Sequence, residues 1–349
     1  MCDLLIEPKG SKTDELVFLL KNRITPGVDE TAKVKVDFLT AIAKKEIKCD
    51  LVSRQDAVDI LGTMIGGYNV QSLVDLLRYE DKNISSHIVD SLSNTLLVFD
   101  AFDDVLQLSK TNSDAMQVLK NWSEATWFEK LPKVPESIAV SVFKVSGETN
   151  TDDLSPAVRA TTRSDIPLHA LAMLESRMPG GLETISSLKE KGNPVAYVGD
   201  VIGTGSSRKS AINSLLWHIG EDIPFVPNKR RGGYIIGGNI APIFYNTAQD
   251  AGAFPIECDV TDLKTGDEIV IFPCQGKIIR QTGEEVTRFS LTPNTLLDEI
   301  RAGGRINLIL GRKQTDKARE CLGLEKSSAF VRPNLPEDTG KGFIHLPKK

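Results

Sequence analysis

The sequence predicts a multidomain protein in which an all-α domain at residues 1–133 is followed by an α+β domain at residues 134–332. Apolar residues recur at helical spacing as far as about residue 131, and an alternation typical of β-strands begins directly afterwards. Two prolines separate the two patterns in the segment Leu131-Pro132-Lys133-Val134-Pro135, where they stiffen a linker and stop a helix. Residues 333–349 carry no core-forming period and are predicted to be a tail.

The composition indicates an ordinary soluble protein. The 349 residues are enough for two hydrophobic cores, and the apolar and charged contents, 40% and 26%, are those of a globular chain. A net charge of −5 gives no general attraction to nucleic acids or acidic membranes. The N-terminus lacks a basic-then-apolar signal, and no apolar run has the length of a membrane span. We therefore expect a cytoplasmic protein without membrane contacts.

Helical periodicity predicts the elements of the first domain. The predicted helices cover residues 14–23, 29–46, 54–65, 70–78, 84–99 and 113–128. Asp29 and Ser53 are suited to cap the second and third of these helices. One face of the second helix carries apolar residues, which are Val34, Phe38, Leu39 and Ile42. Short helices in succession suggest a stacked helical repeat, although no sequence period demonstrates one. Their apolar stripes are interpreted as core packing.

The second domain is predicted to be rich in strands. Strands are expected at residues 137–145, 195–202, 234–238, 254–257, 268–272, 277–280, 285–291 and 306–310, and helices at 168–177, 183–191, 209–217, 242–251 and 295–302. Residues 149–156 form a polar turn, in which Asp152 and Asp153 are interpreted as solvated carboxylates rather than as a metal or acid–base site. Residues 225–233 form a flexible basic turn, whose cations are solvated or, alternatively, contact RNA phosphates.

The most informative stretch joins the strand at 195–202 to the helix at 209–217. Gly203 and Gly205 allow backbone angles or close approaches that a side chain would block. Ser206 and Ser207 are suited to cap the helix, whose free N–H groups favour an anion, and Arg208 adds a fixed charge. The phosphate loop of nucleotide hydrolases is missing, and Arg208 replaces the third glycine of the dinucleotide fingerprint. A small acid or a phosphate would fit this loop, and the alternative interpretation is an ordinary capped helix after a tight turn.

The segment Gly203-Thr204-Gly205-Ser206-Ser207-Arg208-Lys209-Ser210 resembles the active-site serine loop in the swivelling domain of the aconitase superfamily. Further segments are similar to the bacterial aconitase B type; they are residues 22–30, 61–69, 143–156, 165–174 and 240–244. The resemblance covers nearly the whole chain. The resemblance implies a HEAT-like helical domain followed by a swivelling β/β/α domain. Members of that family are much longer, and their iron–sulfur domains should follow where this chain ends.

The resemblance also implies roles for individual residues. Ser206 matches the serine that acts as the base when a proton is removed next to a carboxylate. The residues that match those binding a tricarboxylic acid substrate are Arg163, Ser206, Ser207 and Arg208. A serine hydroxyl is a poor base, so N–H groups, a helix terminus and arginine cations must stabilise its alkoxide. Asp153 stands where histidine is common in the wider superfamily, and Arg159 matches no residue of known role.

No metal centre is expected in this chain. Its five cysteines include no C-x-x-C pair, and its four histidines are also scattered; the cysteines are Cys2, Cys49, Cys258, Cys274 and Cys321. The iron–sulfur cluster of the aconitase family needs three cysteine ligands, two of them closely spaced. We therefore expect no metal or cofactor on this chain, and a 4Fe-4S cluster in the missing domains or in a partner subunit.

The sequence leaves two functions open. In the first, the chain is the substrate-binding and base-supplying half of an aconitate hydratase-like hydro-lyase, which interconverts citrate and isocitrate through aconitate. Alone it would be inactive, and it would need a cluster-bearing partner or continuation. In the second, it is a non-catalytic protein derived from aconitase B that contacts protein or RNA through its helical domain. The intact residues Arg163, Ser206, Ser207 and Arg208 favour the first. Methylcitrate and isopropylmalate carry similar carboxylates, so the hydroxy acid is not identified.

Overall fold

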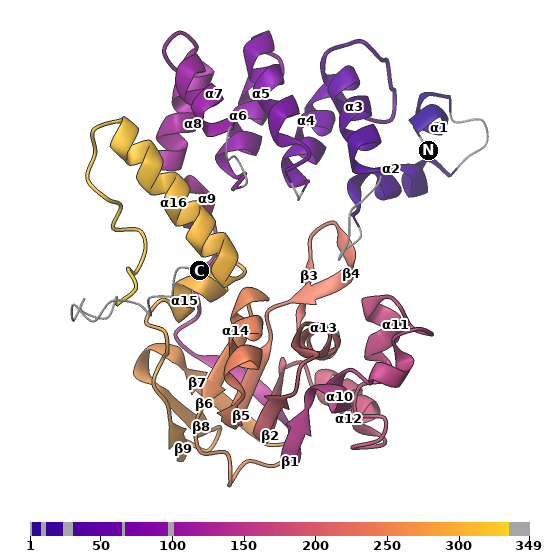
Figure 1. Cartoon of the computed structure of the whole chain (residues 1–349), viewed down its shortest axis with the longest axis vertical. Coiled ribbons are helices and arrows are strands. Elements are labelled where there is room, and N and C mark those ends of the chain that lie inside the picture. Colours follow the sequence, from indigo (N-terminus) through magenta and orange to yellow (C-terminus); the bar gives the residue numbers. More distant parts are fainter. Residues whose placement is uncertain (1, 8–11, 24–30, 65–66, 97–100, 335–349) are drawn as a thin grey trace, which may run out of the picture.

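The computed structural model describes residues 2–7, 12–23, 31–64, 67–96 and 101–334. The first part of the chain is helical, as predicted (Figure 1). Its helices are α1 (Cys2–Ile6), α2 (Thr13–Lys21), α3 (Ala32–Ala43), α4 (Arg54–Thr63), α5 (Val70–Tyr79), α6 (Ser85–Ser93), α7 (Ala101–Leu108), α8 (Ser113–Ser123) and α9 (Thr126–Glu129). Among the described residues, no helix combines the length and the apolar character needed to cross a membrane.

The helices of this part stack in two rows. α3, α5 and α7 pack along one row and α4, α6 and α8 along the other, and helices of the two rows also contact each other. Their apolar faces form one core, to which helix α16 (Arg305–Cys321) contributes Ala318 by packing on α8. Figure 1 shows the resulting arc of helices over the rest of the molecule. Stacking allows such short helices to bury apolar stripes that they could not bury alone.

The helix caps and faces differ in part from the prediction. Ser53 caps α4 in a capping box with Asp56, as expected. Asp29, the other predicted cap, lies outside the described residues. Val34 is predicted to face the core but is 59% exposed, because the buried stripe of α3 runs through Val36 instead. The prediction was correct for the other three residues of that face, which are Phe38, Leu39 and Ile42.

Three predicted helices are shorter or interrupted in the structure. The helix predicted at 84–99 is α6, which ends at Ser93. The helix predicted at 113–128 is broken into α8 and α9 at Ala125, whose φ of 55° is left-handed. The helix predicted at 168–177 is α11 (Ile166–Ala170), which the side chain of Asp165 caps and which turns follow. Periodicity locates a helix, whereas caps and local backbone angles decide where it begins and ends.

The second part of the chain is built on a mixed seven-stranded sheet in the order β6-β5-β2-β1-β7-β8-β9. Its strands are β1 (Ile138–Asn150), β2 (Val195–Thr204), β5 (Tyr234–Ile240), β6 (Phe254–Glu257), β7 (Glu268–Phe272), β8 (Lys277–Arg280) and β9 (Glu285–Arg288). The strands β1, β2, β5 and β6 are parallel, and β7, β8 and β9 continue the sheet in antiparallel pairs. The predicted succession of a helical region and a domain of helices and strands is confirmed.

Helices cover both faces of this sheet. They are α10 (Thr151–Leu154), α12 (Gly181–Lys189), α13 (Arg208–Ile219), α14 (Pro242–Asp250) and α15 (Leu296–Arg301). α11 packs on α13, and short 3-10 turns occur at η1 (Ala157–Arg159) and η2 (Pro273–Gln275). β2 is buried on both faces, as its apolar run predicts. Its residues Val195 and Tyr197 face α12, α13 and α14, while Ala196 and Val198 face the core that α15 covers. The end of β2 therefore emerges from a packed core.

Residues 225–233, predicted to be a flexible basic turn, contribute a strand to a hairpin instead. β3 (Glu221–Ile223) pairs antiparallel with β4 (Val226–Arg231). Arg230 donates to the Asp222 carboxylate at 2.8 Å, and its guanidinium lies 4.7 Å from the centre of the Trp217 ring. This cation is therefore bound rather than solvated. The prediction was wrong because β4 pairs with β3, and β3 lies before the segment that was predicted to be a turn.

Residues 306–310, predicted to be a strand, belong to the long helix α16. The alternation of Ile306, Leu308 and Leu310 fits either period over so short a run. Of these three residues only Leu308 is buried in the helix, and the buried stripe continues through Gly311 and Thr315. A stripe that contains a glycine and a threonine does not show as apolar periodicity, which explains the wrong prediction.

An aromatic cluster attaches α16 to the helical part. Trp127 of α9 lies against Gly311, where a Cβ atom would come within 2.0 Å of the indole ring. The indole Nε1–H donates to Thr315 Oγ1 at 3.2 Å, and the ring stacks on Phe330 with centroids 5.7 Å apart. The contact depends on the missing side chain of Gly311, because a rigid indole cannot move aside as a flexible side chain can.

We expect Gly311→Ala to lower the free energy of unfolding by about 1–3 kcal/mol, the usual cost of overpacking a core. In an exposed helix the same substitution raises the free energy of unfolding by up to about 1 kcal/mol. The sign of the change therefore distinguishes the effect of the contact with Trp127 from the effect of helix propensity. Urea unfolding measures the change. Lys313→Ala, on the exposed face of α16, is the control. A stabilised Gly311→Ala variant would contradict the close contact.

His218 connects α13 to α11 within the second part of the chain. Its Nε2–H donates to the carbonyl oxygen of Ala170, with 2.8 Å between the two atoms. Burial lowers the pKa of the imidazole below its ordinary value of 6.5, and the hydrogen bond to Ala170 offsets this only in part. The folded protein therefore keeps this ring neutral at pH values where the unfolded chain begins to protonate it.

We expect the wild-type protein to lose stability relative to His218→Gln as the pH falls. Below about pH 6.5 the unfolded chain binds more protons than the folded one, so the free energy of unfolding decreases, whereas above that value His218 contributes no pH dependence. Each unit by which the pKa is lowered corresponds to at most about 1.4 kcal/mol. Urea unfolding of both proteins at about pH 7.5 and about pH 5.5 measures the difference. If the difference in the free energy of unfolding stays constant, or if the wild type becomes relatively more stable at low pH, the ring of His218 is not held neutral by burial.

Candidate functional site

The serine loop, residues 203–208, leaves the end of β2 in a turn that requires glycine at two positions. Gly203 has a φ of +80° and packs on Phe244, whose ring a Cβ atom would reach at 2.1 Å. Gly205 has a φ of +109°, and its Cβ atom would lie 2.5 Å from Thr151 Oγ1. Side chains rarely adopt these backbone angles. The two close contacts therefore hold the loop between α14 and α10.

Ser206 and Ser207 are exposed at the start of α13. Ser207 is the N-cap residue, but its side chain accepts no hydrogen bond from the first turn of the helix. The predicted position of the cap is correct, and the predicted capping hydrogen bond is absent. The N–H groups of a first helical turn have no intrahelical acceptor, and they carry the positive end of the helix dipole. Two hydroxyl groups and these N–H groups are thus available together at one end of α13.

Arg208 is the first residue of α13 and is half-buried. Its Nη1 donates to the carbonyl oxygen of Ser206 at 3.2 Å, which fixes the guanidinium beside the loop. Within the described chain no carboxylate forms an ion pair with it. A guanidinium carries five N–H donors in a planar fork, so most of them remain for a carboxylate ligand.

The turn at residues 150–153 lies beside the serine loop, because Asn150 of β1 pairs with Thr204 of β2 in the register of the sheet. The Asn150 side chain accepts from the N–H groups of both aspartates at 2.8 Å, and Asp153 accepts from the N–H of Asn150 at 2.9 Å. Asp152 accepts from the N–H of Ala157 at 2.7 Å. Both carboxylates hold the backbone of the turn, which gives them a structural task in place of simple solvation.

Glu148 and Asp200 also shape the site, and sequence analysis does not single them out. Thr204 Oγ1 donates to Glu148 Oε1 at 2.5 Å, which links β1 to the residue before Gly205. The Asp200 carboxylate accepts from the N–H of Gly147 at 2.7 Å, and this hydrogen bond lowers the pKa of the carboxyl group. The parallel register of β1 and β2 brings these residues together, and no local pattern in the sequence reveals that register.

Arg163 lies between η1 and α11 and is half-buried. Its carbonyl oxygen is 3.1 Å from His169 Nδ1, and the other ring nitrogen, Nε2, is 2.9 Å from Ser155 Oγ. Because a carbonyl oxygen only accepts, His169 Nδ1 carries a hydrogen and donates it to Arg163. His169, which the sequence presents only as one of four scattered histidines, thus fixes the backbone of Arg163.

The structure brings the segment of Arg163 and the serine loop to the same helix. Both α10 and α11 pack on α13, and His218 of α13 donates to the end of α11. Within the described chain no hydrogen bond joins Arg163 directly to residues 206–208. The predicted substrate-binding residues therefore lie on two segments that share one supporting helix.

The neighbouring arginine, Arg159, is already neutralised. Its Nε and Nη2 donate to the two carboxylate oxygens of Glu175 at 2.9 and 3.1 Å. This hydrogen bonding lowers the pKa of Glu175, and the charge of Arg163 contributes to a smaller extent. Arg163 itself forms no ion pair with any residue that the structure describes. Of these two arginines, only Arg163 is free to bind an anionic ligand.

The described residues do not fit an iron–sulfur cluster. They contain no group of three or more histidine, cysteine or acidic side chains that could hold a metal ion, and the five cysteines are free thiols in separate places. Such a cluster requires three cysteine ligands at one place. The chemistry that this part of the chain supports is anion binding through N–H groups and guanidinium forks, next to an exposed hydroxyl.

Two families match the chain. The family described as aconitate hydratase 2 N-terminus matches residues 140–343, and the family described as aconitate B N-terminal domain matches residues 1–128. Aconitate hydratase B of Synechocystis sp. is 66% identical over 343 residues, and that of Pseudomonas aeruginosa is 53% identical over 355 residues; each match covers 98% of this chain. The methanogen homoaconitase small subunit of Methanocaldococcus jannaschii is 28% identical over 173 residues, which make up 49% of this chain and 89% of that subunit.

The chain spans 40% and 41% of the lengths of the two aconitate hydratase B relatives. The matched families are N-terminal ones, so the shared region is the N-terminal part of those longer proteins. The resemblance to the bacterial aconitase B type, which the serine loop and the other similar segments indicate, is confirmed over both parts of the fold. This chain belongs to the aconitate hydratase B family.

Proposed function

We propose that this chain is the substrate-binding and base-supplying half of an aconitate hydratase-type hydro-lyase. The observation that carries the proposal is the serine loop, where two exposed hydroxyls and the positive end of α13 lie next to Arg208, whose guanidinium has no carboxylate partner in the described chain. Membership of the family and the similarity to a homoaconitase small subunit support it. The proposed substrate is a tricarboxylic acid, with citrate and isocitrate interconverted through aconitate.

Ser206 is proposed as the base that takes the proton from the carbon next to a substrate carboxylate. A serine hydroxyl does not ionise at neutral pH unless its alkoxide is stabilised. The first-turn N–H groups of α13, the helix dipole and the Arg208 guanidinium supply that stabilisation. The loop is held by the contacts of Gly203 and Gly205, so these groups are in position before a substrate arrives.

Arg163, Ser207 and Arg208 are proposed to bind the substrate carboxylates. Each guanidinium can accept a carboxylate in a two-point hydrogen bond, which fixes the orientation of the substrate as well as its position. The two arginines approach from different segments, so they are suited to different carboxylates of one molecule. The bond from His169 to the carbonyl oxygen of Arg163 keeps the second segment in place.

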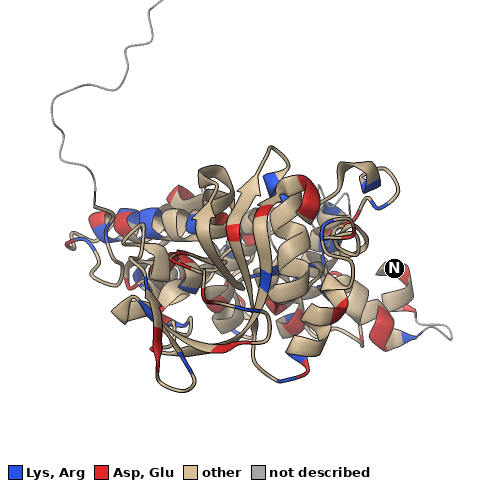
Figure 2. Ribbon diagram, turned by 90° about the horizontal axis from the view of Figure 1, so that it is seen from below, with Lys and Arg blue, Asp and Glu red and all other residues tan. Residues whose placement is uncertain are grey.

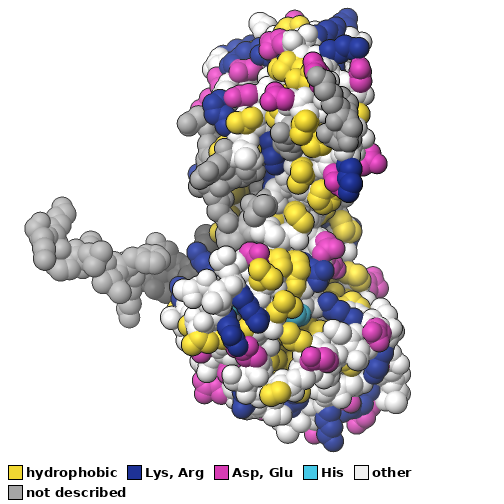
Figure 3. All heavy atoms as spheres, turned by 90° about the vertical axis from the view of Figure 1, so that its right-hand side faces the viewer, with side chains coloured by type: hydrophobic (Ala, Val, Ile, Leu, Met, Phe, Trp, Pro, Cys, Tyr) yellow, Lys and Arg dark blue, Asp and Glu magenta, His cyan; other side chains and the backbone are white. Residues whose placement is uncertain are grey.

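A cluster-bearing aconitase region, as a continuation of the chain or as a separate subunit, is proposed as the partner. Large apolar side chains are exposed beside Arg163, at Val158, Leu168 and Leu171. Figure 3, which views the molecule from this side, shows hydrophobic side chains reaching the surface. Exposed apolar patches of this kind mark protein contacts. The partner would carry the 4Fe-4S cluster, for which the described residues offer no ligands, and the complex would act in the cytoplasm.

We also propose that the helical part is a HEAT-like domain and the α/β part a swivelling domain. The two-row stack of α3 to α8 supports the first assignment. The proposed boundaries are residues 1–133, 134–332 and a tail at 333–349. The packing of α16 on α8 shows that a helix from the second segment completes the stack of the first.

We expect this chain to be inactive alone and to gain aconitate hydratase activity with the cluster-bearing remainder of an aconitate hydratase B relative, prepared separately under anaerobic conditions. Ser206→Ala should lower kcat by roughly 10²–10⁴-fold, the usual contribution of a general base, while KM changes little. The absorbance of aconitate measures both. Ser187→Ala, an exposed serine of α12, is the control. Equal activity of Ser206→Ala, or no activity of the wild-type complex, would contradict the proposal and favour a non-catalytic role in protein or RNA contacts.

We expect Arg163→Lys to raise KM about tenfold or more, because a lysine cannot reproduce the two-point hydrogen bond to a carboxylate. Arg159→Lys is the matched control, since it lies four residues away and its fork is engaged by Glu175. It should leave KM unchanged and change stability little, because the ion pair lies at the surface. Steady-state kinetics of the reconstituted complex measures both variants. If KM rises more in Arg159→Lys than in Arg163→Lys, the assignment of Arg163 as a substrate-binding residue is wrong.

A further inference from the structure

A second group of cations lies at the opposite end of the parallel strands from the serine loop. The serine loop follows the end of β2, whereas β4 leads through Gly232 and Gly233 into the beginning of β5. Between the β3–β4 hairpin and the ends of α2 and α4 lies a pocket of about 370 Å³, which we call the hairpin pocket. This volume falls in the range of small-molecule sites, about 300–1,000 Å³.

The charged residues that the structure describes in the lining of the hairpin pocket are all basic. Its described lining includes three cations and no acid; the lining residues are Arg23, Thr63, Ile223, Pro224, Phe225, Val226, Lys229 and Arg231. Elsewhere in the molecule basic and acidic residues are interspersed, as Figure 2 shows. Partly buried walls of low dielectric strengthen the field of such a group of cations. The pocket therefore attracts anions.

Arg23 provides the wall of the pocket on the helical side. Its N–H donates to the carbonyl oxygen of Phe225 at 2.8 Å, and its Nη1 donates to Thr63 Oγ1 at 3.2 Å. The guanidinium lies 5.6 Å from the centre of the Phe225 ring, and the residue is only 6% exposed. These contacts fix a positive charge at the pocket and join the hairpin to the helical part.

The strand β4 divides its own cations between two faces. Arg230 is directed to one face, where it binds Asp222 and lies over Trp217. Lys229 and Arg231 flank it and therefore share the other face, and both line the pocket. The fold neutralises the middle cation and leaves the two that line the pocket.

Lys229 is half-buried, and its ammonium group forms no ion pair or hydrogen bond with any residue that the structure describes. Burial alone lowers its pKa, with no opposing effect of a nearby acid. A partly buried charge without a partner costs free energy. An anion in the pocket would remove this cost.

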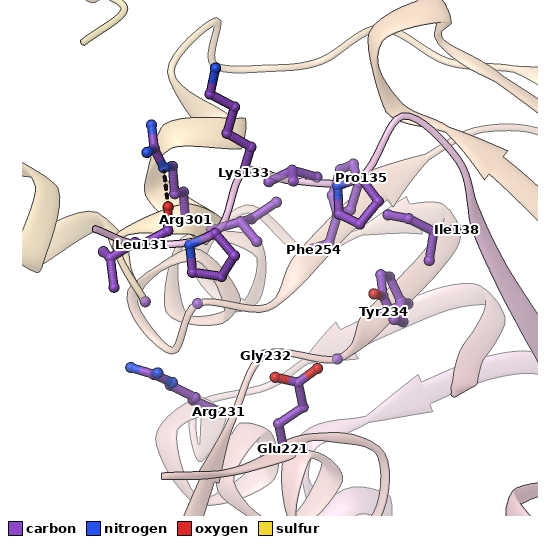
Figure 4. Close-up of a pocket in the computed structure, with 16 residues that line it drawn as sticks. Leu131, Lys133, Pro135, Ile138, Glu221, Arg231, Gly232, Tyr234, Phe254 and Arg301 are labelled. Atoms are coloured by element: carbon purple, nitrogen blue, oxygen red, sulfur yellow. Dashed lines mark hydrogen bonds between the residues drawn. The ribbon is translucent and has the colours of Figure 1, made fainter. Parts of the chain in front are cut away.

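Arg231 has an acidic neighbour but does not pair with it. Glu221 is opposite Arg231 in the register of the hairpin, yet no ion pair joins their side chains in the described chain. Figure 4 shows the Arg231 guanidinium pointing away from the Glu221 carboxylate, at a second pocket of about 220 Å³ next to the linker. Arg231 lines both pockets, while Glu221 lines only the second.

We propose that the hairpin pocket binds a small anion with carboxylate or phosphate groups, through Lys229 and Arg231 on the wall that β4 forms. Two cations on one face of a strand suit a molecule with more than one negative group, such as a tricarboxylate or a phosphate ester. This site is separate from the serine loop and does not depend on the function proposed for that loop. It would let a metabolite bind where the helical part meets the sheet.

Lys229→Met tests the proposal, because methionine keeps the apolar length of the side chain and removes the charge. Citrate and inorganic phosphate are titrated calorimetrically, at constant ionic strength, into the full chain carrying Arg208→Ala, which weakens anion binding at the serine loop. We expect Kd to rise at least tenfold when Lys229→Met is added. Lys191→Met, an exposed lysine, is the matched control and should leave Kd unchanged. In buffer without either anion, Lys229→Met should have an equal or higher Tm, since a desolvated charge is lost.

The two titrations distinguish the two classes of anion. If citrate binds more tightly than phosphate, the pocket is assigned to carboxylates, and if phosphate binds more tightly, it is assigned to phosphate compounds. A lower Tm of Lys229→Met without anion would mean that the ammonium is satisfied within the protein, which overturns the proposal. Unchanged Kd in Lys229→Met would do the same. The proposal would also be overturned if neither citrate nor phosphate bound and a single-stranded RNA oligomer bound in a Lys229-dependent manner.

Discussion

The candidate site depends on two contacts that only glycine permits. At Gly203 the end of β2 touches the Phe244 ring, and at Gly205 the next turn touches Thr151. A side chain at either position would push the serine loop away from α14 or α10, and Ser206 would lose its place at the start of α13. The loop is consequently positioned by packing and backbone angles, while the hydroxyls of Ser206 and Ser207 keep their hydrogen-bonding capacity for a ligand. Groups held in this way need no rearrangement when a ligand binds.

The helical part is attached to the α/β part at two separate places. Trp127 packs on Gly311 of α16, and Arg23 binds the tip of the β3–β4 hairpin at Phe225. Two attachments resist rotation about a single linker, so the prolines at 132 and 135 do not act as a free hinge. A ligand in the hairpin pocket would therefore contact residues of both parts. This arrangement gives the hairpin pocket a mechanical connection to the helices as well as a charge.

Features that are contiguous in the sequence could be predicted, and features that depend on pairing between segments could not. The strand, the glycine turn and the helix start from 195 to 208 lie in one stretch, so Ser206, Ser207 and Arg208 could be proposed as neighbours from the sequence. By contrast, the bond from His169 to Arg163 and that from Thr204 to Glu148 require the fold. The same limit explains the strand wrongly predicted at 306–310, whose helical stripe is completed by Gly311.

The number of cations in a segment says less about binding than which of them the fold has already neutralised. Arg159 and Arg230 are bound to carboxylates of the protein, so their charge serves the structure. Arg163, Arg208 and Lys229 are half-buried without an ion pair in the described chain, so their charges remain available to a ligand. These unpaired cations fall into two places, one at each end of the parallel strands. We propose that both places bind anions, because the cations there lack a carboxylate partner in the described chain, whereas Arg159 and Arg230 already have one.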